Sequence, residues 1–302
     1  CWNHHAHLEA YFGIPAAGGV MHTLNLRLSP EEIGWIAADA GDRFLIIDDV
    51  LLPLYEQFKH LHPFEEVFVV PFSGAPVPAG FTDYEALLAS ADPDGFRYAE
   101  HHEDDAVSMC YTSGTTGRPK GVVYSHRSTV LHTLVASLAD FWALRGSDVV
   151  LPVTPMFHAN SWGMPYGAVM MGAKLVFPGP HLHPDDLLDL IQQEPPTLSL
   201  GVPTIWLGMI QTYEASLKPD SPNHGRWQLP AGMRSLVGGA AVPESLIRAF
   251  DRHGVWLMQG WGMTETSPLA TVSYVKSELK DAPMDERYRR AAMAGVPAPL
   301  VE

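Results

Sequence analysis

Residues 111–126 combine small, hydroxyl-bearing and basic side chains in the way that phosphate binding requires. The run reads YTSGTTGRPKGVVYSH and directly follows an apolar stretch typical of a strand. Its glycines let the backbone turn tightly and point N–H groups at phosphate oxygens, and the hydroxyls and Lys120 add further donors and a positive charge. It is not a Walker A loop, because Arg118 and Pro119 separate Gly117 from Lys120. The pattern predicts a phosphate-binding loop; the alternative is an ordinary flexible turn.

A second candidate segment, LMQGWGMTETSP, occupies residues 257–268 and again follows a strand-like run. Gly260 and Gly262 flank Trp261, so a flat ring could approach the backbone and stack on the indole. Glu265 offers an oxygen ligand suited to Mg²⁺ held together with phosphate. Alone, this segment is a weak signal.

Two further segments contain side chains that could line a site. VGGAAVP, residues 237–243, is a strand ending in two glycines before a helix, which is where open α/β sheets bind ligands. In PMFHANSWGMPYG, residues 155–167, His158 and Trp162 are four residues apart, and helical spacing would place them on one face. Read in isolation, the simpler alternatives are a strand-to-helix turn and a core Trp beside a hydrogen-bonded His.

Short apolar runs alternate with helix-length amphipathic stretches, the pattern of βα units with a mainly parallel sheet. One helix has a complete start and stop signal, with Ser29 as N-cap, Pro30, Glu32 and the terminating Gly41. We expect strands at 43–48, 66–71, 106–111, 148–153, 174–178, 197–202, 234–239 and 255–260, and other helices at 126–144, 183–193, 204–217 and 243–253. Residues 218–232 read as a surface loop, and a domain seam is expected at 147/148.

Composition excludes several classes of protein. The 302 residues are 46% hydrophobic and 18% charged, so the chain should fold, and a net charge of -15 argues against nucleic-acid or anionic-membrane partners. Leu45 to Leu54, the richest apolar run, contains Asp48 and Asp49 and is too short to span a membrane. Only two cysteines are present, which favours a reducing compartment and predicts a cytoplasmic protein.

Together these segments resemble the adenylate-forming superfamily, whose phosphate loop reads [YF]TSG[TS]TGxPKG and is matched at every fixed position by residues 111–121. WNHHAHLEAYFGIP, HTLNLRLSPEE, MFHANSW, GVPTIW, GGAAVP and QGWGMTETSP occur in the order found in bacterial long-chain fatty-acyl-CoA synthetases. The resemblance implies an α/β fold in which repeated βα units form two helix-flanked sheets of the large N-terminal adenylation domain, incomplete at both ends.

The resemblance also implies a two-step reaction. A fatty carboxylate attacks the α-phosphate of Mg-ATP to give acyl-adenylate, and coenzyme A thiolate then displaces AMP. The implied catalytic residues are Lys120, His158, Thr264 and Glu265, with Thr112 and Glu265 as Mg²⁺ ligands and Trp162 as the gate of the acyl tunnel. The implied nucleotide-binding residues are Thr112, Ser113, Gly114, Thr115, Thr116, Gly117, Lys120, Gly239, Ala240, Ala241, Gln259, Gly260, Trp261, Gly262 and Thr264.

Two departures from the family pattern bear on these implications. The family usually has Tyr where Trp261 stands, and an indole can still stack on adenine. The chain ends at PLVE302 without the family's TGD segment or the small C-terminal domain with its catalytic Lys. We therefore expect an internal fragment that is inactive or impaired alone.

Two alternatives stay open: another acid-adenylating enzyme, acting on aryl or medium-chain acids, and a non-catalytic nucleotide- or acyl-binding scaffold. The sequence specifies neither the length of the acyl chain nor the oligomeric state, and a homodimer stays open. His4, His5 and His7 have poor metal-ligand spacing, and we expect no Cys or second His group to join them, so structural or solvent-facing roles are expected. Cys110 reads as a small core residue.

Overall fold

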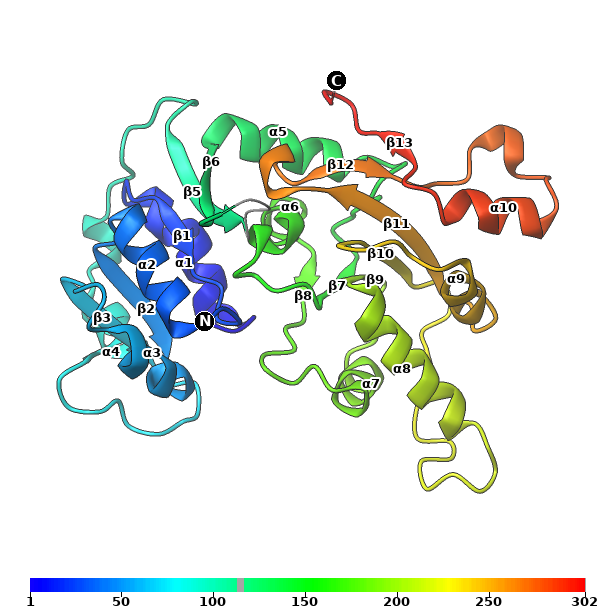
Figure 1. Cartoon of the computed structure of the whole chain (residues 1–302), viewed down its shortest axis with the longest axis horizontal. Helices are drawn as coiled ribbons and strands as arrows, with labels where there is room; N and C mark the ends of the chain where they lie inside the picture. Colours follow the sequence, from blue (N-terminus) through cyan, green and yellow to red (C-terminus); the bar gives the residue numbers. More distant parts are fainter. Residues whose placement is uncertain (113–116, 302) are drawn as a thin grey trace. The chain divides into compact units, whose positions relative to one another are not determined.

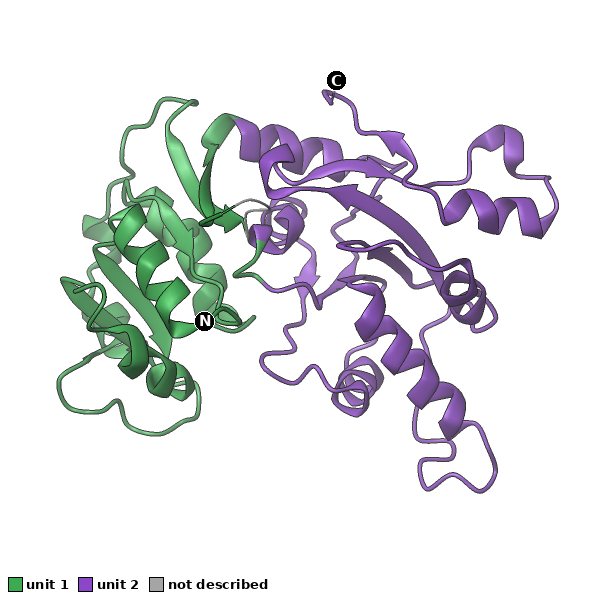
Figure 2. Ribbon diagram, viewed as in Figure 1, with its two compact units in different colours: residues 1–127, 156–158 green, residues 128–155, 159–302 purple. Residues whose placement is uncertain are grey.

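The structure is a computed structural model that describes residues 1–112 and 117–301. The chain forms two compact units, residues 1–127 with 156–158 (unit 1) and residues 128–155 with 159–302 (unit 2) (Figure 2). The seam expected at 147/148 falls inside unit 2, because Ala136 and Trp142 belong to a core shared with that unit's sheet.

Unit 1 contains two three-stranded sheets with helices beside them (Figure 1). One has the order β1-β5-β6 and the other β2-β3-β4. The elements are α1 (His5–Ala16), β1 (Met21–Thr23), α2 (Pro30–Ala40), β2 (Phe44–Asp48), η1 (Asp49–Leu51), α3 (Leu52–Phe58), β3 (Glu66–Val70), β4 (Thr82–Asp83), α4 (Tyr84–Ser90), η2 (Pro93–Gly95), β5 (Ala106–Thr112) and β6 (Lys120–Ser125).

Helix α2 begins and ends where its sequence predicts. The Ser29 hydroxyl accepts the N–H of Glu32, and the Glu32 carboxylate accepts the N–H of Ser29, which satisfies two donors that a helix start leaves unpaired. Gly41 ends the helix in the left-handed conformation at φ 69°. The buried face carries Ile33, Ile36 and neighbouring small residues.

Unit 2 is built on a seven-stranded sheet of order β13-β12-β11-β10-β9-β7-β8. Helix α5 (His126–Ala136) enters it, and the other elements are β7 (Val149–Pro152), η3 (Ala159–Gly163), α6 (Met164–Met171), β8 (Lys174–Leu175), α7 (Pro184–Gln193), β9 (Leu198–Gly201), α8 (Pro203–Ser216), β10 (Arg234–Val237), α9 (Glu244–Asp251), β11 (Trp256–Gly262), η4 (Thr264–Thr266), β12 (Leu269–Val272), η5 (Ser277–Leu279), α10 (Met284–Ala291) and β13 (Val296–Pro297).

Alternate residues of the central strands point into two different cores. Val237 and Leu257 join a cluster with side chains of α7, α8 and α9, whereas Leu236 and Met258 join one with Ala136 of α5 and Met164 of α6. Because successive strand residues face opposite sides, these helices cover opposite faces of the sheet. Both faces are therefore covered, and every residue of β9 is buried.

The mixed α/β fold agrees with the prediction, and the differences are local. The described residues form three sheets rather than two, because β1 and β2 do not pair with each other. Helix α5 ends at Ala136 instead of 144, since the chain turns there and buries Trp142 under the sheet. The 218–232 loop has no regular element, yet it buries Trp227 and Leu229 in the core, where the Trp227 N–H donates to Asp189.

Candidate functional site

The predicted phosphate loop connects two antiparallel strands of unit 1. Thr112, the last residue of β5, lies directly opposite Lys120, the first residue of β6. Ser113, Gly114, Thr115 and Thr116 lie outside the described residues. Lys120 is exposed and forms no ion pair with any carboxylate in the described part of the chain. The ammonium group and the Thr112 hydroxyl are thus brought to one end of a hairpin, as phosphate binding requires.

The base of this hairpin is attached to α2 through Tyr111. The Tyr111 hydroxyl donates to the Asp39 carboxylate at 2.7 Å, and burial together with that carboxylate raises the pKa of the phenol. The ring packs 5.2 Å from His22, whose Nδ1 lies 2.8 Å from an oxygen of Asp42. These contacts hold Tyr111 in place directly before the loop.

Residues 156–158 are fixed to unit 1 by two hydrogen bonds to the α1 region. The Tyr11 hydroxyl donates to the Met156 carbonyl at 2.5 Å, and the Met156 N–H donates to Asn3 Oδ1 at 2.8 Å. His158 follows with an exposed side chain. Surrounding protein, and to a smaller degree the charge of Arg27, lowers the His158 pKa, so its neutral form is favoured at neutral pH.

In unit 2, the two predicted glycine segments lie against each other and against Trp162. A Cβ on Gly238 would lie 2.7 Å from the Gly260 carbonyl oxygen and 3.3 Å from the Trp162 ring. A Cβ on Gly260 would lie 3.0 Å from Leu236. The ends of β10 and β11 therefore approach closely only because both positions lack a side chain, and the indole of Trp162 packs over this point. Gly239, at φ 80°, then turns the chain toward exposed Ala240 and Ala241.

The side chain of Gln259 stabilises the turn formed by residues 238–242. Its side chain is buried, and its Oε1 accepts the N–H of Val242 at 2.9 Å. The resemblance implies a place for Gln259 around the nucleotide. In the structure its carbonyl oxygen holds the 238–242 turn, so we assign it a positioning role.

The turn after β11 presents the remaining predicted residues. Trp261 is 47% exposed, and Glu265 is exposed without an ion pair to any described basic residue. Thr264 is buried. A Cβ on Gly262 would lie 1.9 Å from the Pro268 carbonyl oxygen, so only glycine fits where this turn closes. An open indole face and an unpaired carboxylate suit stacking on a base and binding of a divalent cation.

The expected helical pairing of His158 with Trp162 is wrong. Residues 159–162 all have positive φ, between 44° and 57°, and form a left-handed turn rather than an α-helix. The hydroxyl groups of Ser161 and Thr154, 2.6 Å apart, hydrogen-bond to each other inside the turn. Left-handed backbone costs roughly 1–2 kcal/mol per residue that has a Cβ. Such strain is found where surrounding structure enforces it, commonly at functional sites.

His132, on α5, is a residue that the sequence analysis missed. Its Nε2 accepts the N–H of Leu269 at 3.3 Å, and a Cβ on Gly163 would lie 2.8 Å from its Nδ1. Burial lowers its pKa to about 4, so the ring is neutral at neutral pH and can accept this hydrogen bond. The ring thus supports both the left-handed turn and the segment after Glu265. An isolated His in an apolar helix gives no sequence signal for this role.

The structure therefore brings the predicted residues together in two separate groups, one in each unit. Unit 1 brings Thr112 and Lys120 together, and unit 2 brings Trp162, Gly238 and Gly260 together. Thr112 and Glu265 belong to different units, as do His158 and Trp162. Their joint roles in Mg²⁺ and acyl binding are taken up as proposals below.

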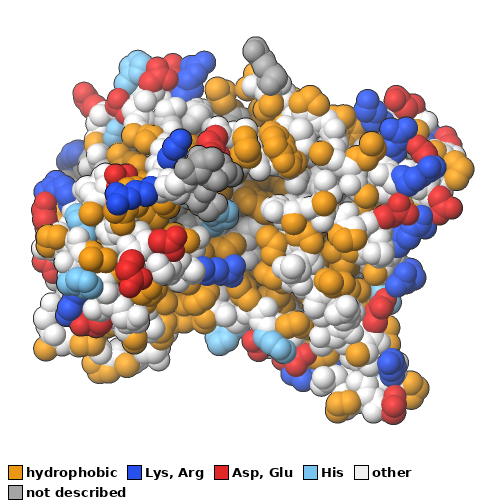
Figure 3. Space-filling view, viewed as in Figure 1, with side chains coloured by type: hydrophobic (Ala, Val, Ile, Leu, Met, Phe, Trp, Pro, Cys, Tyr) orange, Lys and Arg blue, Asp and Glu red, His pale blue; other side chains and the backbone are white. Residues whose placement is uncertain are grey.

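The surface carries charged groups of both signs. On the face drawn in Figure 3, Lys and Arg side chains are interspersed with Asp and Glu instead of forming one basic patch. No helix among the described residues is long and apolar enough to cross a membrane. Cys110 is buried in β5, as expected.

Comparison with known proteins decides the family. The AMP-binding enzyme family matches residues 1–302. The chain belongs to this family. A long-chain-fatty-acid–CoA ligase of Thermus thermophilus is 47% identical over 301 residues, which cover 99% of this chain and 53% of that protein. A 3-methylmercaptopropionyl-CoA ligase of Ruegeria pomeroyi is 41% identical, covering 100% of this chain and 55% of that protein.

A solved structure supports the same fold. The anthranilate CoA ligase AuaEII in complex with anthranoyl-AMP has a TM-score of 0.78 at 24% identity, covering 96% of this chain and 52% of that one. The chain thus spans about half the length of the curated relatives that it matches.

Proposed function

We propose that the protein is an AMP-forming acyl-CoA ligase that activates a fatty carboxylate with ATP and transfers the acyl group to coenzyme A. The observation that carries this proposal is the β5–β6 hairpin, where the complete TSGTTGRPKG sequence places Thr112 opposite an unpaired Lys120. Membership of the AMP-binding enzyme family gives this hairpin its context. Lys120 is exposed and ends the loop opposite Thr112, so in an acidic chain it is the natural local phosphate contact.

In the proposed first step, the protein contributes positioning and charge neutralisation. Lys120 and the loop hold the β- and γ-phosphates, and exposed Trp261 stacks on adenine. The turn at Gly239 lies beside the base, and Thr264 contacts the α-phosphate. His158, in its neutral form, lies beside the reacting carboxylate and can donate or accept a hydrogen bond there.

Two residues are proposed to hold Mg²⁺, whose role is to neutralise charge on the phosphates during displacement. Glu265 fits because its carboxylate is exposed and unpaired among the described residues, and Thr112 fits because its hydroxyl ends β5 beside the loop. Oxygen ligands of this kind suit Mg²⁺. Coenzyme A is the proposed acceptor in the second step, and the two cysteines, both free, are compatible with a cytoplasmic location.

Trp162 is the proposed gate of the acyl site. Its indole is half-buried and packs over Gly238. Trp162 is the last of the four residues of the left-handed turn. Movement of that turn would change the space beside Gly238 and Gly260. Long-chain acids are the proposed substrates because the Thermus relative bears that name. The Ruegeria relative makes a short thioether-containing acid a second candidate.

The proposal is tested with a series of saturated acids of increasing length and 3-methylmercaptopropionate, using Mg-ATP and the protein extended to the length of its relatives. Acid-dependent release of pyrophosphate and formation of acyl-CoA are measured. We expect both products, with the largest kcat/KM for the longer acids. Nucleotide binding without pyrophosphate release for any acid would favour the non-catalytic scaffold.

The gate is tested in the same protein with Trp162→Ala. A gate predicts nearly unchanged ATP affinity and an altered dependence of kcat/KM on acyl length, since each buried methylene contributes about 0.8 kcal/mol. A purely structural Trp predicts a large drop in Tm and an unchanged length profile. Leu207→Ala is a suitable control, because Leu207 is an exposed apolar residue of α8.

A further inference from the structure

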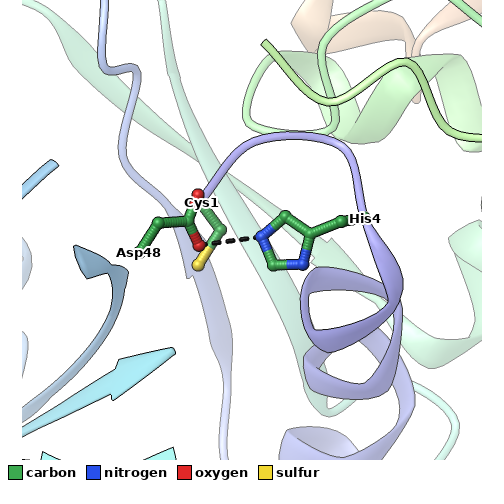
Figure 4. A group of neighbouring side chains, drawn as sticks. All are labelled: Cys1, His4 and Asp48. Atoms are coloured by element: carbon green, nitrogen blue, oxygen red, sulfur yellow. Dashed lines mark hydrogen bonds and ion pairs between the residues drawn. The ribbon is translucent and has the colours of Figure 1, made fainter. Parts of the chain in front are cut away.

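Side-chain contacts in unit 1 tie helices to strands at two places. At the first, Cys1, His4 and Asp48 bring metal-ligating atoms within 4.8 Å of one another (Figure 4). One oxygen of Asp48 accepts the Trp2 N–H at 2.8 Å, and the other lies 2.8 Å from His4 Nε2. Because each Asp48 oxygen has a partner in the protein, this group holds the start of α1 against the end of β2. The second place lies at the β5–β6 hairpin.

Tyr111 makes the contact of the first arm of the hairpin. It lies directly opposite Gly121 of β6, and a Cβ on Gly121 would lie 3.1 Å from the Tyr111 ring. The ring thus extends across the neighbouring strand at a position that a larger residue would crowd. Its hydroxyl donates to Asp39 of α2 at 2.7 Å, and its ring centroid lies 6.4 Å from that of Trp35 at an interplanar angle of 85°. One side chain therefore connects β5, β6 and α2.

Arg118 makes the contact of the second arm. It precedes the start of β6 at Lys120 by two residues, and its Cζ lies 5.1 Å from the centroid of the Trp35 ring. A guanidinium over an indole face is a favourable cation–π contact. Arg118 is exposed and forms no ion pair with a carboxylate in residues 1–112 or 117–301. The indole of Trp35 is therefore the group that holds this side chain.

Both contacts end on one face of α2. Trp35 and Asp39 are four residues apart, so their side chains are neighbours on the helix surface. The opposite face of α2 is buried through Ile33 and Ile36, and capping contacts fix both ends of the helix. The helix is thus a rigid support that meets the two arms of the hairpin at adjacent points.

We propose that Trp35, Asp39, Tyr111 and Arg118 form a hairpin clamp, which fixes the two arms of the β5–β6 hairpin on α2 and thereby sets the affinity of the phosphate loop for nucleotide. This inference rests on the proposed function. The four residues are positioning residues, because they act through the phosphate-binding groups that the arms carry.

Those groups follow the clamp closely in sequence. Thr112 comes directly after Tyr111, and Lys120 comes two residues after Arg118. A shift of either arm on α2 therefore displaces one of the two groups. Donors that are already held in place lose less conformational freedom when a ligand binds, so a fixed hairpin binds phosphate more tightly than a loose one.

The test measures the Kd for Mg-ATP by calorimetry in the 302-residue chain and in two variants. Tyr111→Phe loses only the hydroxyl that binds Asp39, and Trp35→Leu loses the ring under Arg118. We expect each variant to raise the Kd about threefold to tenfold, as the loss of one such contact allows. Trp35→Phe keeps an aromatic face and should restore most of the affinity.

Matched controls remove the same kinds of contact elsewhere in unit 1. The Tyr84 hydroxyl donates to Glu9 at 3.0 Å, and the Arg43 Cζ lies 5.0 Å from the centroid of the Phe44 ring. Tyr84→Phe and Phe44→Leu should lower the Tm by amounts similar to those of the clamp variants and leave the Kd for Mg-ATP unchanged. Equal weakening of ATP binding by these controls would reduce the clamp to a general effect of stability and overturn the proposal.

The role of Arg118 is decided by Arg118→Met and by its combination with Trp35→Leu. If Arg118 acts through Trp35, the double variant binds Mg-ATP no more weakly than the weaker single variant. A clearly larger loss for Arg118→Met than for Trp35→Leu would place Arg118 directly on the phosphates and overturn its positioning role.

Hydrogen exchange gives a readout of the hairpin itself. Backbone amides of 110–112 and 120–122 should exchange faster in Tyr111→Phe and Trp35→Leu than in the parent or the controls, and unchanged exchange would contradict the clamp. Mg-ATP binding by the parent with an unchanged Kd in both clamp variants would overturn the clamp alone. Absence of Mg-ATP binding by the parent would overturn the proposed function and the clamp with it.

Discussion

At the scale of single residues, the described basic side chains differ in whether they pair with a carboxylate. Lys120 stands exposed at the phosphate hairpin, whereas Arg43, Lys59 and Lys174 form ion pairs with carboxylates. An acidic protein repels a nucleotide at long range, so binding must come from local donors. The function of Lys120 is therefore open to direct measurement.

Lys120→Ala should weaken ATP binding by about 1–3 kcal/mol, the range for a lost charged hydrogen bond. Isothermal titration calorimetry with Mg-ATP measures the change. Lys59→Ala is the matched control, because Lys59 lies in unit 1 but pairs with Glu56 on α3. Equal affinities of the two variants would remove Lys120 from the nucleotide site.

His132 should make stability depend on pH. Its pKa is about 4 in the folded chain and 6.5 when unperturbed. Between these values the unfolded chain binds more protons, so stability falls as the pH is lowered from about 6.5 toward 4. The difference corresponds to about 1–3 kcal/mol, with the lower end applying because the ring is not fully enclosed.

Urea unfolding at pH 7 and pH 5 measures this contribution, with His132→Phe as the comparison. The variant loses the acceptor for the Leu269 N–H and should be less stable at pH 7, but it should lose less stability on acidification than the parent. His7, whose pKa burial lowers to about 3, is present in both proteins and cancels from the difference. Parallel pH profiles would contradict the assignment.

At the scale of elements, the site depends on strand ends that come unusually close. Gly238 at the end of β10 and Gly260 in β11 approach so closely that neither tolerates a side chain without movement. Trp162 closes the same point from the left-handed turn. The backbone geometry of three elements is thus interdependent.

Gly238→Ala should destabilise the protein by about 1–3 kcal/mol, as overpacking in a rigid position does. The added methyl group would meet a carbonyl oxygen at 2.7 Å, and neither strand end can yield easily. Gly13→Ala is the control, because nothing lies within 4 Å of a Cβ there and α1 gains a better helix former. Thermal unfolding should separate the variants; similar Tm values would show that β10 and β11 adjust freely.

The elements also show how far sequence reasoning reaches. Apolar runs predict the buried strands, and the Ser29 capping signal predicts α2 with its ends, because these features depend on neighbouring residues. The phosphate loop also rests on a local pattern, but it stays a prediction, since residues 113–116 lie outside the described part of the chain. The left-handed turn at 159–162 and the support from His132 depend on contacts between residues far apart in sequence, so no local pattern specifies them. The helical spacing assumed for Trp162 fails because tertiary packing overrides it.

At the scale of the whole molecule, the chain matches the AMP-binding enzyme family over residues 1–302 but spans about half the length of its relatives. The proposed second step needs a thiol site and exclusion of water from the phosphates. We propose that regions of the relatives beyond this match supply both.

The 302-residue chain by itself should therefore bind Mg-ATP but form little acyl-CoA. Calorimetry measures the first property, and a thioester assay with a long-chain acid measures the second. The Lys120→Ala chain serves as the background for both. Rapid thioester formation by the parent chain would show that these 302 residues contain all the required groups.

Strands β1 and β2 each pair on one side only within the described part of the chain, which has a consequence for handling the protein. Open strand edges beside apolar surface are templates on which other chains can add strands. Copies of this chain can therefore associate through these edges in concentrated solution, independently of any biological oligomer. Its solubility would then be governed by a few backbone N–H and C=O groups, despite the mutual repulsion expected from a net charge of -15.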